Sequence, residues 1–364
     1  MDPTFTAWFD SLRLSDRPSV GGKCANLGEL VSAGIPVPNG FAVTVAAFEA
    51  FEELNDLRDH IRSGLIDSVD ATNSAALRQV HKEASELIHK AYLPERLEQE
   101  IREGYAELCR RAGRDDLPVA VRSSAVAEDG DASSFAGQQE TYLWVIGADD
   151  VLAAIRDCWA SLFTPQAVAY REKLDEDRRR EATRISVAVQ EMVNAKVSGV
   201  AFTVSPRTGD PSVVAVNASW GLGEAVVSGE VTPDEFWLTK VGPALTSSTV
   251  SHKQHQCLPA VGRKGTEMVD VPEELRDVAC LDEPLVIELA ALAIKVEQHY
   301  GSPQDIEWAL AADGQGGHRF MLLQSRPETT HVQARAARKP APATASSYLS
   351  VLKDLGAATR GDKS

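Results

Sequence analysis

The sequence has 364 residues, 43% of them hydrophobic and 25% charged, which is enough for two or three globular domains with a large core. Its formal net charge is -16, which argues against nucleic acid or an anionic membrane as the main partner. An anionic ligand would therefore need a local cationic pocket.

The cysteines and the hydropathy pattern indicate the compartment. Five cysteines are scattered along the sequence without a CxxC pair, which favours a reducing compartment over a disulfide framework. The first residues lack the apolar core of a signal peptide, and no apolar stretch is long enough to span a membrane. We expect a cytoplasmic protein without a membrane partner.

The first half of the sequence predicts a short lead-in, several helices and three short strands. Leu27, Leu30 and Val31 form an apolar stripe, and Gly34 and Pro36 end the helix that carries it. In chain order we expect a helix at 25–33, a strand at 41–44, mostly helix at 45–112, strands at 118–122 and 140–145, and a helix at 149–173 interrupted near Pro165.

The second half of the sequence predicts mostly strands. The charge run at 177–181 is either a hinge between subdomains or a solvated surface. From residue 332 on, the composition is low in large apolar residues and predicts a flexible tail. Between them we expect strands at 185–190, 199–204, 213–216 and 234–238, a helix at 283–300, and a hairpin with strands at 305–310 and 319–324.

The hairpin carries acidic and amide groups where a buried strand is normally apolar. Strand alternation places Glu307 on the face opposite Ile306 and Trp308. Glu307 and Gln324 offer oxygen ligands, and Arg326 follows closely, which suits a magnesium–polyphosphate complex. A half-exposed hairpin with a solvated glutamate explains the same residues equally well.

Two basic residues stand where an element could present them to an anion. Gly21, Gly22 and Lys23 open a helix, where free N–H groups and the helix dipole favour a phosphate. A plain glycine turn with a surface lysine is the simpler alternative. Arg122 ends a predicted strand and could clamp a phosphate, unless it pairs with one of the nearby acids.

Two further segments could contact a nucleotide. The small polar loop at 133–141 could cover phosphates with main-chain donors, although it also fits a surface hairpin. The edge at 190–193 could bond an adenine ring through backbone groups, although Met192 is equally explained as core filling. Together these segments favour a nucleotide site built from two subdomains, without naming the reaction.

Several motifs follow one another in an order known from one enzyme family. They lie at 21–41, 121–125, 134–141, 198–203, 221–224, 303–309 and 323–329. Over residues 18–330 the sequence resembles the phosphoenolpyruvate synthase and pyruvate phosphate dikinase family. The resemblance implies an α+β fold, an ATP-grasp-like nucleotide-binding module of two subdomains with ATP between them. The implied division is an N-terminal subdomain at 1–180, a C-terminal subdomain at 181–330 and a flexible tail at 331–364.

The resemblance also implies a role for each candidate residue. Lys23, Arg122 and Arg326 are the implied catalytic cations, while Glu307 and Gln324 are the implied ligands of Mg²⁺. The other residues implied to contact ATP are Gly22, Gly137, Gln138, Gln139, Thr141, Gln190, Glu191, Met192 and Val193. In this family the phosphates of ATP pass to a histidine on a separate domain, and AMP and phosphate are released.

The family's phosphohistidine domain has no recognisable counterpart in this sequence, since His252 lacks the Gly-rich Thr-Ser-His context. We therefore expect that histidine on a partner subunit in trans, as in phenylphosphate synthase and the cresol-phosphorylating synthases. The implied acceptor is an aromatic hydroxyl compound such as phenol or cresol, bound mainly by the partner. Cys24 and Trp144 depart from the family pattern near the implied nucleotide site.

Other functions fit the same residues. The chain could be a subunit of a phosphoenolpyruvate synthase or of an antibiotic phosphotransferase. It could be a nucleotide-sensing module without catalysis. A third alternative is a self-contained ATP-grasp ligase that works through an acyl phosphate and releases ADP.

Overall fold

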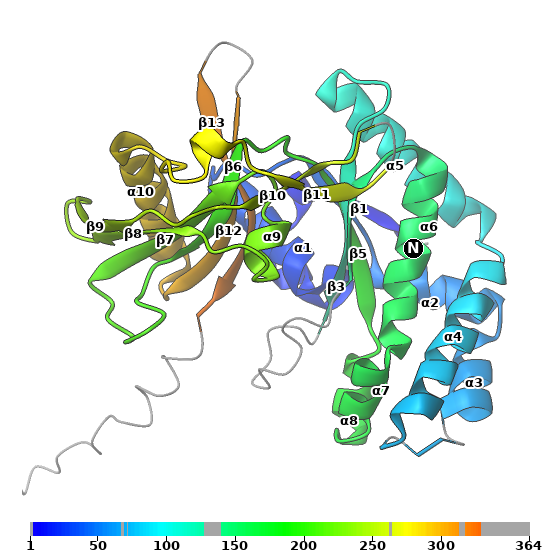
Figure 1. The fold of residues 1–364 in the computed structure, drawn as a ribbon. Coiled ribbons are helices and arrows are strands. Elements are labelled where there is room, and N and C mark those ends of the chain that lie inside the picture. Colours follow the sequence, from blue (N-terminus) through cyan, green and yellow to red (C-terminus); the bar gives the residue numbers. More distant parts are fainter. Residues whose placement is uncertain are drawn as a thin grey trace, which may run out of the picture.

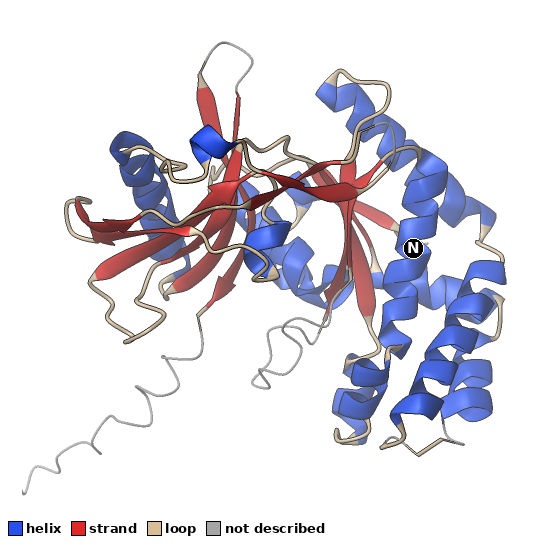
Figure 2. Cartoon of the chain, viewed as in Figure 1, coloured by secondary structure: helices blue, strands red, loops and turns tan. Residues whose placement is uncertain are grey.

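A computed structural model describes residues 3–66, 69–70, 72–126, 140–261, 264–312 and 317–328. The chain forms two β-sheets that lie side by side, each covered by its own helices (Figures 1 and 2). Helix α1 (Arg17–Ser32) lies between the two sheets and contacts both of them. The described strand pairings within both sheets are antiparallel, as the α+β class predicts.

The first sheet has five strands, with α1 on one face and a layer of helices on the other. Its strand order is β1-β2-β5-β3-β4, so that β5 is the central strand. The strands are β1 (Thr6–Trp8), β2 (Gly40–Val43), β3 (Val119–Ala125), β4 (Thr141–Val145) and β5 (Ile185–Glu191). The helices around it are α2 (Val45–Leu54), α3 (Leu57–Ile61), α4 (Ser74–Lys90), α5 (Glu95–Ala112), α6 (Ala148–Ala160), α7 (Pro165–Arg171) and α8 (Glu176–Glu181).

Aromatic side chains fill the space between the first sheet and its helices. Phe51 stacks on Trp159 with ring centroids 4.9 Å apart, and both side chains are fully buried. The break expected near Pro165 is present, because the chain passes through a 3₁₀ turn (Ser161–Phe163) before α7 begins at that proline. Further short helices are the 3₁₀ turns Phe9–Ser11, Leu14–Asp16 and Glu273–Leu275, and the π-helix Arg62–Ile66.

The second sheet has six strands in the order β13-β12-β6-β7-β8-β9. Its main helix is α10 (Glu283–Tyr300). Asp282 caps its N-terminus, and Gly301, with a φ of 68°, caps its C-terminus. The strands are β6 (Val197–Phe202), β7 (Val213–Trp220), β8 (Asp234–Thr239), β9 (Leu245–Thr249), β12 (Gln304–Ala312) and β13 (His318–Pro327). A short helix α9 (Glu224–Val227) and the strand pair β10 (His255–Pro259) and β11 (Thr266–Asp270) lie beside it.

The hairpin of β12 and β13 follows the predicted alternation. Ile306 and Trp308 are fully buried and Leu310 is nearly so, whereas Glu307 on the opposite face is half-buried. Trp308 meets Phe320 edge to face, with ring centroids 5.6 Å apart. The apolar face therefore attaches the hairpin to the core of the second sheet.

The two sheets divide along the chain between β5 and β6. Since β5 belongs to the first sheet, this division falls after Glu191 and not at 180 and 181. The expected subdomain boundary stays a prediction, because a division of sheets does not by itself define a domain.

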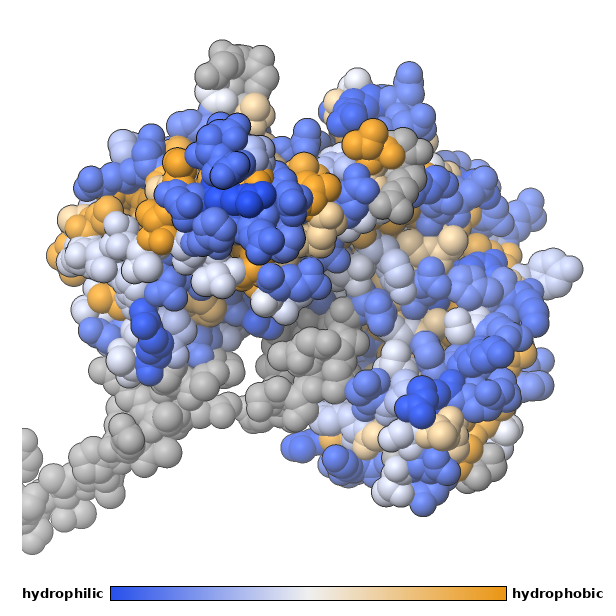
Figure 3. Space-filling view, in the orientation of Figure 1, coloured by the Kyte–Doolittle hydropathy of each residue, from blue (hydrophilic) through white to orange (hydrophobic). Residues whose placement is uncertain are grey.

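Within the described ranges, no helix has both the length and the apolar character needed to cross a bilayer. Figure 3 shows a largely hydrophilic face, which agrees with two buried apolar cores.

Candidate functional site

Arg122 of β3 reaches from the first sheet to the hairpin of the second. Its Nη2 donates to Oε2 of Glu307 at 2.9 Å and to Oε1 of Gln324 at 2.7 Å. Its Nη1 donates to the carbonyl oxygen of Leu323 at 3.2 Å. The Arg122 side chain is only 12% exposed, so these bonds are shielded from solvent. We call Arg122, Glu307, Gln324 and the Leu323 carbonyl the Arg122 cluster.

The register of the hairpin explains why these acceptors converge. Glu307 of β12 pairs directly with Gln324 of β13, and Trp308 pairs with Leu322. Leu323 is therefore the extra residue of a β-bulge, which leaves its carbonyl group outside the regular ladder. The bulge thus places a third acceptor beside the two side-chain oxygens.

Lys23 lies next to this cluster through the backbone of β3. Its Nζ donates to the carbonyl oxygen of Ser123 at 2.9 Å, and the side chain is 8% exposed. The chain can approach so closely because Gly21 has a φ of 71° and lacks a Cβ, which would overlap the Ser124 carbonyl oxygen. Helix α1 begins at Arg17, earlier than expected, and is kinked at Gly21, so that Gly22 and Lys23 follow the kink.

The loop expected to cover the phosphates is described only at its end. Thr141 opens β4 beside Arg122 in the sheet register, and its side chain is exposed. Gly137, Gln138 and Gln139 lie outside the described residues. Gly22 is buried within α1.

The expected adenine edge lies where β5 leaves the first sheet. Gln190 is buried, and its Nε2 has no hydrogen-bond partner among the described residues. The N–H groups of Glu191 and Met192 already donate to the carbonyls of Asn39 and Pro118. The side chains of Met192 and Val193 are partly buried and pack against a small apolar cluster between the sheets.

That apolar cluster adjoins the Arg122 cluster. Its buried members are Ala195, Leu222, Ala225, Cys257 and Ala309, and Trp144, Met192, Val193, Val231 and Leu323 pack against them. Leu323 belongs to both groups, because its carbonyl oxygen binds Arg122 while its side chain packs against the apolar cluster. An apolar surface and a set of polar ligands thus meet between the two sheets.

Arg326 does not join the Arg122 cluster in this structure. Its Nε donates to Oδ2 of Asp305 at 2.8 Å, and its side chain is 46% exposed. Burial raises the pKa of Asp305, although the ion pair with Arg326 acts in the opposite direction. Asp305 and Arg326 face each other in the hairpin register, two positions along their strands from Glu307 and Gln324.

Three features of the site could not be read from the residue pattern. The acceptor roles of Ser123 and Leu323 use backbone carbonyls, which any residue type can supply. Trp144 adopts a φ of 56° in β4, which is unusual for an aromatic residue, and packs against the apolar cluster. Cys24 is fully buried, and its N–H donates to Oγ of Ser124.

Comparisons with known proteins decide the family. The family description "Pyruvate phosphate dikinase, AMP/ATP-binding domain" matches residues 17–347. The chain belongs to this family. Its α+β fold is therefore that of a nucleotide-binding module, and membership of the family supports ATP as its ligand.

Relatives of this family extend well beyond the chain. It is 44% identical over 326 residues to a protein of Methanothermobacter thermautotrophicus named probable phosphoenolpyruvate synthase, covering 90% of this chain and 46% of the relative. It is 39% identical to the phosphoenolpyruvate synthases of Pyrococcus furiosus and Aquifex aeolicus, covering 97% and 89% of this chain but 47% and 39% of those proteins. The chain thus spans less than half the length of these relatives.

Proposed function

We propose that the chain binds ATP between its two sheets and supplies the phosphoryl group to a histidine on a partner subunit. The observation that carries this proposal is the Arg122 cluster beside an apolar surface. In the proposed arrangement Gln190, Glu191, Met192 and Val193 line the adenine, with Met192 and Val193 packing on its ring. The buried Nε2 of Gln190 supports this, because an acceptor on a ligand would relieve the cost of leaving that donor unsatisfied.

The phosphates are proposed to lie along the end of β3. Arg122 and Lys23 supply positive charge there, and the N–H groups around Gly22 are proposed to complete the cradle beside Thr141. Arg326 turns from Asp305 toward the phosphates when charge develops. These groups act by positioning and by electrostatic stabilisation of the equatorial oxygens.

The donor set of the hairpin fits Mg²⁺. Oxygens of Glu307 and Gln324 converge on one guanidinium nitrogen, so the point between them already favours a cation. Among the described residues no group of three or more His, Cys, Asp or Glu side chains could hold a metal alone. Mg²⁺ commonly takes one or two carboxylates and completes its shell with water and phosphate. When bound, the ion would neutralise phosphate charge.

The receiving histidine is proposed to come from another subunit. In the described part of the chain, no histidine contacts the Arg122 cluster. His252 is exposed, and its Nδ1 lies 2.9 Å from Oδ1 of Asp277. The reaction balances when the anhydride between the α- and β-phosphates of ATP breaks and AMP leaves. The histidine nitrogen loses its proton and takes the β-phosphoryl group, and the bond between the β- and γ-phosphates breaks when water takes the γ-phosphoryl group as phosphate.

The final acceptor is proposed to be a small hydroxyl compound bound mainly by the partner. An aromatic hydroxyl such as phenol or cresol fits a split enzyme of the phenylphosphate synthase type. The names of the relatives favour a second candidate, a subunit of a phosphoenolpyruvate synthase with pyruvate as acceptor. An antibiotic phosphotransferase subunit or a nucleotide sensor without catalysis would leave both acceptors unphosphorylated.

The proposal is tested by incubating the chain and its co-purifying partner with ATP and Mg²⁺, and then with phenol, cresol or pyruvate. We expect AMP as the nucleotide product and an acid-labile, base-stable phosphate on the partner. The phosphorylated acceptor then distinguishes the two candidates. ADP as the sole nucleotide product would contradict the AMP-forming reaction, and an unphosphorylated partner would contradict the role of its histidine.

A further inference from the structure

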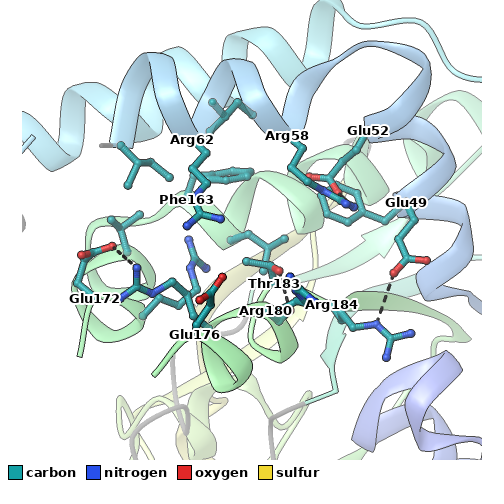
Figure 4. Close-up of a pocket in the computed structure, with 17 residues that line it drawn as sticks. Glu49, Glu52, Arg58, Arg62, Phe163, Glu172, Glu176, Arg180, Thr183 and Arg184 are labelled. Atoms are coloured by element: carbon teal, nitrogen blue, oxygen red, sulfur yellow. Dashed lines mark hydrogen bonds and ion pairs between the residues drawn. The ribbon is translucent and has the colours of Figure 1, made fainter. Parts of the chain in front are cut away.

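A second cavity lies in the helical layer of the first sheet, away from the Arg122 cluster. It has a volume of about 560 Å³, and residues of α2, α3, α7 and α8 contribute to its wall (Figure 4). Six arginines line it, namely Arg58, Arg62, Arg171, Arg179, Arg180 and Arg184. Such a concentration is unexpected in a chain whose net charge is -16.

The acidic residues of the wall neutralise only part of this charge. Four glutamates line the cavity, and three of them form ion pairs with its arginines. The pairs are Arg58 with Glu52 at 3.0 Å, Arg184 with Glu49 at 3.4 Å and Arg179 with Glu172 at 3.8 Å. Figure 4 shows Arg62 extending from the upper helices toward the side that carries Glu176 and Arg180.

Arg171 is the most unusual member of the wall. Its side chain is 5% exposed, and its buried Nη1 has no hydrogen-bond partner among the described residues. Its guanidinium carbon lies 5.9 Å from the centre of the Phe163 ring, and the charges of Glu172 and Arg179 act on it in opposite directions. Burial lowers the pKa of Arg171 to about 10, so the side chain still carries its charge at neutral pH. A buried guanidinium with an unsatisfied donor is costly, and an anion that accepts from Nη1 would relieve that cost.

The remaining wall is apolar. Phe48, Phe163, Ile61, Leu162 and Val168 line the cavity together with the arginines. A pocket of this kind suits a ligand with an anionic head and an apolar body, because polar groups orient the ligand and apolar walls bury it. The planar guanidinium of arginine matches the oxygens of a phosphate or a carboxylate.

We propose that this cavity, which we call the Arg171 pocket, binds a small organic phosphate or carboxylate whose anionic head pairs with Arg171. The apolar body of the ligand lies against the aromatic and aliphatic wall. None of the lining residues belongs to the Arg122 cluster, so the pocket is a second ligand site independent of ATP.

The test measures thermal unfolding in the Arg122→Met variant, in which anions bound at the ATP site contribute little. The probes are inorganic phosphate, n-butyl phosphate and pentanoate, compared with n-butanol and with sodium chloride at equal ionic strength. We expect n-butyl phosphate or pentanoate to raise Tm saturably, by about 2–5 °C at tenfold its dissociation constant. The better of the two identifies the preferred head group, and inorganic phosphate should act more weakly than n-butyl phosphate.

Variants of two neighbouring arginines locate the effect. Adding Arg171→Met should abolish the anion-dependent rise without lowering Tm in chloride, since it removes a buried charge that has an unsatisfied donor. Adding Arg178→Met should preserve the rise, because Arg178 is 72% exposed and lies outside the pocket wall. If Arg171→Met does not fold, Arg180→Met in the same wall should weaken the response. A rise that survives Arg171→Met, a rise that Arg180→Met leaves unchanged, or no rise beyond that in chloride overturns the proposal.

Discussion

Arg122 is the residue through which the two sheets contact each other at the site. One guanidinium group binds a carboxylate, an amide and a backbone carbonyl of the hairpin, all in a poorly solvated position. The same group is proposed to hold phosphate, and its contacts with the hairpin keep it oriented. A cation prepared in this way stabilises developing charge without further reorganisation.

Replacing Arg122 with methionine should therefore remove activity more than stability. We expect kcat/KM for AMP formation with the partner to fall by about 10²–10³, as when a preorganised charge-stabilising group is lost. Arg207→Met is the matched control, because Arg207 is 66% exposed and pairs with Glu235 on β8. Equal rates for the two variants would exclude Arg122 from the site.

A second charged residue, Lys253, serves the fold. Its Nζ donates to Oδ1 of Asp234 at 2.6 Å, and neither side chain is exposed. Lys253→Met should lower the free energy of unfolding by about 3–5 kcal/mol, because it leaves the Asp234 carboxylate buried without its counter-ion. Urea unfolding measures this loss, and Arg207→Met should cost under about 1 kcal/mol in the same assay. Similar values for both variants would contradict the assignment.

Among the elements, the two strands of the hairpin could be predicted from the sequence, whereas their contacts with Arg122 of β3 could not. The alternation of Ile306 and Trp308 with Glu307 is a local pattern, so the buried face was readable from the sequence. The bonds from Arg122 to Glu307 and Gln324 join residues 185 and 202 positions apart, and no local pattern records such pairs. Strand β9 was not predicted, because most of its residues are exposed and lack apolar alternation.

Helix α1 depends on one glycine at its kink. In Gly21→Ala the new Cβ would overlap the Ser124 carbonyl oxygen, and the φ of 71° is also unfavourable for alanine. We expect a loss of more than about 2 kcal/mol in unfolding free energy and weaker ATP binding, since Lys23 lies two residues after Gly21. Gly34→Ala separates the two causes, because Gly34 has a φ of 66° with no atom within 4 Å of its Cβ position. It should cost about 1–2 kcal/mol and leave ATP binding unchanged. Equal losses would mean that close packing at Gly21 is unimportant.

At the scale of the whole molecule, the site exists only because two separate sheets meet. The first sheet contributes Arg122 and Lys23, and the second contributes Glu307 and Gln324. The order of the motifs predicted the family and the α+β class. How the sheets divide was harder to predict, because β5 follows the charge run at 177–181 but returns to the centre of the first sheet.

Calorimetric titration with ATP and Mg²⁺ tests the central claim most directly, because it needs neither partner nor acceptor. We predict saturable binding to the unaltered chain, and at least tenfold weaker binding in Arg122→Met and in Glu307→Gln, a loss of about 1.4 kcal/mol or more each. Arg171→Met should bind ATP as the unaltered chain does. If Arg122→Met and Glu307→Gln both retain full affinity, the nucleotide does not bind between the two sheets at the Arg122 cluster.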